Sequence, residues 1–157
     1  QVLGNLKANS ANDALELLLL LNPQISDSSN LVTYAQAEFL AEQKKFDEAA
    51  ILYKQLADNQ QAFILHTISS IKYGEMLIAI DNYQDAVTVL EAVSSEGEKN
   101  IYADKAVYLL GKINQYGLSN FSKAEEYYQK LLADYPKSIY ADDSRTQILL
   151  LQNKPGT

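Results

Sequence analysis

Residues 46–56 read FDEAAILYKQL, and two later segments, YQDAVTVLEAV at 83–93 and FSKAEEYYQKL at 121–131, repeat the same pattern. An aromatic residue opens each copy, an alanine follows three positions later, and large apolar residues stand seven and ten positions after the first residue. The copies begin 37 and 38 residues apart, so a unit of nearly constant length recurs along the chain. Repeats of this length indicate an array built from one small structural unit.

A second set of recurring residues lies upstream of these segments and gives each unit two halves. Small residues occupy one column of this upstream half, namely Ala37, Gly74 and Gly111. In the downstream half, Ala49, Tyr53 and Leu56 fall at i, i+4 and i+7, which places them on one face of a helix. Strand-like alternation is nowhere sustained. The pattern therefore predicts pairs of helices at 31–57, 62–95 and 100–134.

The third unit holds one residue more than the others, between Gly111 and Phe121. The stretch at 116–120 reads YGLSN, and Gly, Ser and Asn favour turns. We therefore expect the extra residue to lengthen the turn between the two helices of this unit.

The two ends of the chain depart from the full unit. Ala14, Leu18 and Leu21 repeat the apolar column of 49–56 at a distance of 35 residues. We therefore expect a partial leading pair over 1–22, with its second helix at 12–21. At the other end, the tetrapeptide IYAD at 101–104 returns at 139–142, which predicts a capping helix over 139–152 and a tail at 153–157. We interpret the chain as a single domain and as a piece of a longer protein.

Composition excludes several classes of function. Thirteen Lys and Arg against twenty Asp and Glu give a net charge of -7, which disfavours nucleic acid as a partner. The sequence has no Cys and a single His, so it offers no thiolate or imidazole cluster, and we expect no metal and no cofactor. The longest apolar run, Leu17–Leu21, is far shorter than the roughly 20 residues that cross a bilayer.

Motifs that carry catalysis are missing from the sequence as well. It contains no Gly-rich phosphate loop, nucleophile elbow or zinc-protease motif. A catalytic role for His66 needs a positioned partner, and we interpret this residue as an ordinary one near a helix start. The pair Asp142-Asp143 also stands at a helix start, where acids suit the helix dipole. The expected protein is therefore not an enzyme.

At these columns the chain resembles the tetratricopeptide repeat family, whose unit carries a small residue in its first helix and an aromatic residue before its second. The resemblance spans residues 31 to about 152 and is strongest at Tyr108–Gly111 and Phe121–Pro136. The units are 37 to 38 residues long, against about 34 in the family. The family implies an all-α, right-handed superhelical solenoid of antiparallel helix pairs whose first helices line a concave face.

The junction at 135–143, which reads YPKSIYADD, is similar to junctions in bacterial exported members of the family. Such members include envelope-assembly lipoproteins and division-associated periplasmic proteins. On this resemblance we expect an exported or periplasmic protein rather than a cytoplasmic one.

The concave face that the resemblance implies supplies the candidate partner-binding site. Two columns of the first helices lie there, occupied by Tyr34, Ile71 and Tyr108 and, four residues later in each unit, by Glu38, Glu75 and Lys112. Aromatic and apolar contacts would give affinity, and the charged groups would select the partner. Family members that clamp a C-terminal carboxylate use Lys and Asn at these columns, so we expect a basic or apolar segment here instead.

Two functions follow from this interpretation. The first is a non-catalytic scaffold that binds a peptide or protein segment on the concave face. The alternative is structural, a homo-oligomerisation module or an intramolecular spacer of a larger envelope-associated protein. The contact would then be made by the second pair, whose first helix is apolar on several faces, with Leu65, Ile68, Ile71, Ile78 and Ile80.

Overall fold

A computed structural model of the chain describes residues 28–62 and 64–153. Within these ranges every regular element is helical and no strand occurs. The expected leading pair at 1–22 and all but the first residue of the expected tail at 153–157 lie outside the described residues.

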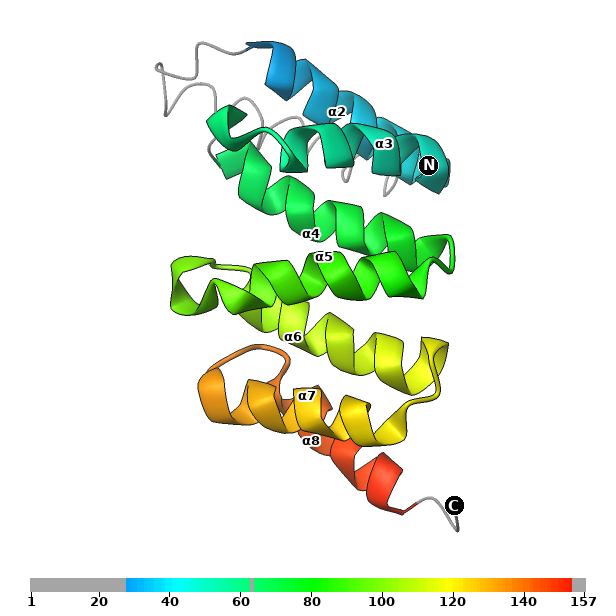
Figure 1. The fold of residues 1–157 in the computed structure, drawn as a ribbon, viewed down its shortest axis with the longest axis vertical. Coiled ribbons are helices and arrows are strands. Elements are labelled where there is room, and N and C mark those ends of the chain that lie inside the picture. Colours follow the sequence, from blue (N-terminus) through cyan, green and yellow to red (C-terminus); the bar gives the residue numbers. More distant parts are fainter. Residues whose placement is uncertain (1–27, 63, 154–157) are drawn as a thin grey trace, which may run out of the picture.

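The described chain forms three helix pairs and one further helix (Figure 1). We call the leading member of each pair, together with the last helix, a first helix, and the other members second helices. The first helices are α2 (Ser28–Glu42), α4 (Ile64–Ala79), α6 (Ala103–Lys112) and α8 (Ala141–Gln152). The second helices are α3 (Phe46–Ala57), α5 (Tyr83–Ser95) and α7 (Phe121–Asp134). Short turns of helix follow α3, α5 and α6, namely η1 (Gln60–Ala62), η2 (Gly97–Lys99) and η3 (Ile113–Gly117).

The helices stack in chain order along the longest axis of the molecule, as Figure 1 shows. Each helix packs against the next one in the chain, and α2 also contacts α4. A helix pair of this size buries too little apolar surface alone, and stacking supplies the continuous core. The predicted fold class, an all-α solenoid of helix pairs, is confirmed.

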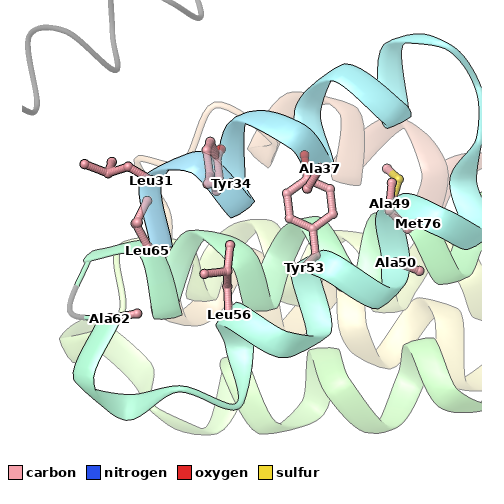
Figure 2. Close-up of a cluster of buried hydrophobic side chains, with 10 residues drawn as sticks. All are labelled: Leu31, Tyr34, Ala37, Ala49, Ala50, Tyr53, Leu56, Ala62, Leu65 and Met76. Atoms are coloured by element: carbon pink, nitrogen blue, oxygen red, sulfur yellow. The ribbon is translucent and has the colours of Figure 1, made fainter. Parts of the chain in front are cut away.

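The repeat columns of the second helices form this core. They are all buried, and they comprise Ala49, Ala86 and Ala124, then Tyr53, Leu90 and Tyr128, then Leu56, Val93 and Leu131. Figure 2 shows the first pair, where the ring of Tyr53 on α3 reaches toward Ala37 on α2. A small residue on the first helix thus leaves room for a large one on the second.

Close approach explains the glycines of the first helices. A methyl group added at Gly111 would lie 2.5 Å from Cε1 of Tyr128, and one added at Gly74 would lie 2.8 Å from Cδ2 of Leu90. Both distances are shorter than packed carbon atoms tolerate. The column that holds Ala37, Gly74 and Gly111 is therefore fixed by the large residue that faces it.

The turn inside each pair holds one residue in the left-handed region of the backbone. Lys44, Asp81 and Ser119 have φ angles of 61°, 60° and 53°. Left-handed backbone costs a non-glycine residue about 1 kcal/mol or more. The same turn conformation recurs in all three pairs, so the turns repeat along the chain as the core columns do.

The extra residue of the third unit lies in η3, the segment that continues α6. The sequence predicts it instead in the turn at 116–120. The segment η3 is a π-helical turn, in which the amide of Leu118 donates to the carbonyl of Ile113 at 2.9 Å. A π turn takes up one additional residue while its backbone groups stay hydrogen-bonded. The wider turn carries the side chains of Asn114 and Gln115 into the interior, where both are buried.

The apolar second pair is a packed part of the solenoid. Leu65, Ile71 and Leu77 are buried, and no described large apolar side chain of α4 or α5 is exposed. Within the described residues this pair therefore offers no fully exposed large apolar side chain, and the alternative of homo-oligomerisation through it stays untested. In the same ranges, no helix combines the length and the apolar character that a membrane crossing requires.

Candidate functional site

The six residues expected to bind a partner lie on one face of the first helices, which we call the first-helix wall. Tyr34 and Glu38 come from α2, Ile71 and Glu75 from α4, and Tyr108 and Lys112 from α6. The structure places these side chains in three different environments.

Tyr34 and Ile71 are core residues. Both are buried, and the ring of Tyr34 meets that of Tyr53 edge to face, with their centroids 5.8 Å apart. Ile71 packs with Leu90 and neighbouring apolar residues. A large side chain at this column fills the space between a first helix and its second helix, so we do not retain these two residues as partner contacts.

Glu38 ties three helices together. Nζ of Lys72 on α4 lies 2.9 Å from Oε1 of Glu38, and the hydroxyl of Tyr53 on α3 donates to the same oxygen. Burial raises the pKa of the Glu38 carboxyl, but the hydrogen bonds from Tyr53 and Lys72 and the charge of Lys72 outweigh it, so the pKa lies below its ordinary value. Burial and the bond to Glu38 raise the pKa of Tyr53.

Glu75 repeats this role one unit later. Nζ of Lys105 on α6 lies 2.5 Å from its Oε1, and both side chains are partly exposed. The two carboxylates of this column thus join consecutive first helices by ion pairs. Their charges are compensated within the chain, which removes the reason to expect a basic partner at Glu38 and Glu75.

Tyr108 makes the corresponding connection between α6 and α8. Its hydroxyl donates to Oδ2 of Asp143 at 2.6 Å, and its ring stacks on that of Tyr140 with centroids 4.6 Å apart and planes 15° apart. Burial raises the pKa of Tyr108, and the hydrogen bond to Asp143 raises it further. The ring is therefore held from its edge and from one face.

Lys112 lies among tyrosines at the same end of the wall. Its Nζ is 4.8 Å from the ring centroid of Tyr116 and 5.9 Å from that of Tyr108. Tyr116 is 61% exposed, yet its hydroxyl donates to Oε1 of Gln147 at 2.7 Å. Leu150 follows Lys112 by one repeat and is 52% exposed. We call the set Tyr108, Lys112, Tyr116, Tyr140 and Leu150 the α6–α8 patch.

A buried network of hydrogen bonds connects α7 to the residues of this patch. The hydroxyl of Tyr128 on α7 donates to Oε1 of Gln115 at 2.7 Å, and Nε2 of Gln115 donates to Oε1 of Gln147 at 3.1 Å. Nε2 of Gln147 in turn donates to Oδ1 of Asp143 at 3.3 Å. Buried polar groups that are mutually satisfied rigidify their surroundings. The chain of bonds ends at Asp143, the residue that anchors Tyr108.

The third pair, which carries most of this patch, can be assigned to a family. Residues 105–138 match the family model described as tetratricopeptide repeat. The third pair is a tetratricopeptide repeat. The matched range contains the segment 108–111 and most of 121–136, the two segments on which the resemblance in the sequence was strongest.

The tetratricopeptide fold extends over the rest of the array. A solved structure described as "MamA RS-1 ArsTM double mutant" is similar to the chain with a TM-score of 0.58 and 22% identity, covering 94% of this chain and 88% of that chain. At this level of identity the likeness concerns the fold. No curated protein matches the sequence. Tetratricopeptide repeats act as scaffolds for protein–protein interaction, and the match of the third pair supports that general role.

A cleft lies on the second-helix side of the array. It is an open cleft of about 520 Å³ between α3 and α5, and its lining includes Lys54, His66, Tyr73 and Asp85. Nδ1 of His66 is buried and has no hydrogen-bond partner among the described groups. A catalytic histidine is oriented by such a partner. Among the described residues, no group of three or more His, Cys, Asp or Glu side chains is placed to hold a metal ion.

Sequence reasoning missed the residues that hold the first helices together. Lys72, Lys105 and Asp143 pair with candidate site residues, and Gln147 links Tyr116 to the buried network. Lys72 and Lys105 follow the acids that they pair with by 34 and 30 residues. These spacings differ from the repeat of 37 residues and from each other, so a search for opposite charges one repeat apart does not find these pairs.

Proposed function

We propose that this chain is a non-catalytic protein-interaction scaffold that binds an apolar segment of a partner on the α6–α8 patch. The observation that carries the proposal is the contrast along the first-helix wall. Around Glu38 and Glu75 the wall is closed by ion pairs between helices, whereas at α6 and α8 it presents Tyr116 and Leu150 more than half exposed.

The patch is pre-organised for binding. The hydroxyls of Tyr108 and Tyr116 are anchored to Asp143 and Gln147, so their rings lose little freedom when a partner packs on them. Tyrosine offers a large contact area and has few rotatable bonds, and it is enriched at binding sites for this reason. Leu150 adds an aliphatic contact that no described core cluster includes.

The charge at the patch favours an apolar partner over a basic one. Lys112 places its ammonium group beside the rings of Tyr108 and Tyr116, where it would repel a cationic side chain. The acids of the wall, Glu38 and Glu75, are already paired. An apolar peptide or the apolar face of a helix is therefore the segment that fits.

Peptides selected on the immobilised full chain from a random peptide library test this proposal. Binding of each selected peptide is measured by fluorescence anisotropy to the wild type, to Leu150→Ser and to Tyr116→Ala. We expect each substitution to weaken binding by about tenfold or more, as truncation of a central interface contact does.

The matched control is Ile51→Ser. Ile51 is 67% exposed but lies on α3, away from the first-helix wall, so peptide binding should not change. Circular dichroism verifies that all three variants stay folded. Peptides that bind the two patch variants as tightly as the wild type, or that lose affinity only for Ile51→Ser, would contradict the proposal.

A further inference from the structure

Helix α2 carries two exposed large apolar side chains in columns that α4 and α6 keep buried. Val32 is 56% exposed and Phe39 is 62% exposed. One and two repeats later, the column of Val32 holds Ser69 and Ala106, and the column of Phe39 holds Met76 and Ile113. All four of these residues are buried.

On α4 and α6 the preceding second helix covers these columns. Met76 on α4 belongs to one core cluster with Ala49, Ala50 and Leu56 of α3, and Figure 2 shows it beside Ala49 and Ala50. Likewise, Ile113 at the end of α6 clusters with Ala86 and other residues of α5. A second helix placed before α2 would cover Val32 and Phe39 in the same way.

The sequence before α2 contains the side chains that such a helix needs. In the three described second helices, the column with Ala49 holds only alanine, the column with Tyr53 only large residues and the column with Leu56 only aliphatic ones. Residues 12–21 supply the same series with Ala14, Leu18 and Leu21.

The connection also has the required length. Six residues, 22–27, separate Leu21 from the start of α2. Six residues, 58–63, connect α3 to α4, seven, 96–102, connect α5 to α6, and six, 135–140, connect α7 to α8. The segment can therefore reach α2 of its own chain by the same step that joins the other units, which favours it over a segment of a second copy.

We propose that residues 12–21 pack as a second helix on α2 and cover Val32 and Phe39. This face of α2 is then an internal docking surface for the chain's own N-terminal segment, and it is distinct from the α6–α8 patch. Burial of an exposed phenylalanine and an exposed valine contributes to the stability of the docked segment.

Hydrogen–deuterium exchange of the full chain, read by mass spectrometry on peptides that cover 12–21, tests this proposal. We expect exchange at least about tenfold slower than the rate of unstructured peptide, because docking protects the backbone amides. Phe39→Asp should abolish this protection. Ile51→Asp is the matched control, since Ile51 is as exposed as Phe39 but belongs to a column with Thr88 and Glu126, and it should leave the protection intact.

Peptides from α7 in the same samples report whether a variant stays folded, and Phe39→Ser replaces Phe39→Asp if they do not stay protected. Unprotected amides at 12–21 in the wild type would overturn the proposal, as would equal protection in the Phe39 and Ile51 variants. Protection that disappears on dilution together with a dimer in light scattering would show that a second copy covers α2, and would also overturn it.

Cysteine trapping gives an independent measurement, because the chain has no cysteine of its own. Leu15 and Phe39 correspond by one repeat to Ala50 and Met76, which share a core cluster. We expect the double variant Leu15→Cys/Phe39→Cys to form an intramolecular disulfide rapidly on mild oxidation, and Leu15→Cys/Ile51→Cys to remain reduced. Equal trapping in the two variants, or a disulfide that forms only between chains, would count against the proposal.

Discussion

Tyr53 donates its hydroxyl to the same oxygen of Glu38 that Lys72 approaches from the next first helix. One carboxylate on α2 thereby joins the second helix of its own pair to the first helix of the following pair. The contact is partly buried. Because both partners bind the carboxylate, the packing of the two pairs against each other depends on the ionisation of Glu38.

Replacing Glu38 with Gln should therefore reduce stability in a pH-dependent way. The pKa of Glu38 in the folded chain lies below the value of about 4.3 for an unfolded glutamate. Its contribution is thus fully present above that value and is lost as the pH falls through the lowered folded pKa. We expect Glu38→Gln to cost about 1–2 kcal/mol at pH 7 and much less at pH 3, measured by urea unfolding.

The control for this prediction is Glu48→Gln. Glu48 is exposed, and its Oε1 lies 3.9 Å from Nζ of Lys45, a geometry that contributes little. The control should change stability only slightly at either pH. A Glu38→Gln variant with the same loss at pH 3 as at pH 7 would contradict the assigned role of the carboxylate.

Alanine substitutions at the two helix glycines should have unequal effects. A methyl group at Gly111 meets the ring of Tyr128, which is buried and hydrogen-bonded to Gln115, so the ring has little room to move. At Gly74 the nearest atom is the flexible end of Leu90. Alanine also favours a helix over glycine by up to about 1 kcal/mol. We expect Gly111→Ala to cost about 1–3 kcal/mol and Gly74→Ala to be nearly neutral in thermal unfolding.

Two neighbouring tyrosines on α7 allow the loss of a buried hydrogen bond to be compared with the loss of an exposed one. Tyr128→Phe leaves Oε1 of buried Gln115 without its donor, and should cost about 1–3 kcal/mol. Tyr127→Phe removes a hydroxyl that donates to Glu91 at the surface, and should cost less than about 1 kcal/mol. Equal losses in urea unfolding would argue against a structural role for the network under the α6–α8 patch.

Alkaline pH should unfold the array through its tyrosines. Burial, followed by contact with acidic groups, raises the pKa of Tyr34, Tyr53 and Tyr108 in the folded chain above the ordinary value of about 10. Their contribution to stability is fully present below that value and is lost as the pH rises from it toward the raised folded pKa. Phenolate absorbance and helical circular dichroism should change together above about pH 10, whereas complete titration of all eleven tyrosines with the helices intact would refute this.

Helix pairing could be predicted from the sequence because steric fit fixes its columns. Tyr128 tolerates only a small residue opposite it, so Gly111 and its equivalents recur at constant spacing. The partners of Glu38 and Glu75 could not be predicted in this way, because long flexible side chains reach the acids from different columns. Lys72 follows Glu38 by 34 residues, but Lys105 follows Glu75 by 30.

The candidate site could be predicted only in part for a related reason. Tyr34, Ile71 and Tyr108 share a column, and periodicity alone treats them as equivalent. Tyr34 and Ile71 are buried, whereas Tyr108 is only partly buried and bonds to Asp143 instead. The sequence predicts a turn at Tyr116, but the π-helical backbone places this residue beside Lys112.

The π-helical turn at 113–117 also bears on how arrays of this kind change length over evolution. The additional residue of the third unit is absorbed at the end of α6, and α7 and α8 keep their stacking, so a one-residue difference in length carries little structural penalty. The numbering nevertheless slips by one beyond this point: the column of Gly111 continues at Leu149, where a fixed period of 37 would lead to Ile148. Repeat comparisons that impose a constant period will misalign such chains, and helix ends are the places where gaps belong.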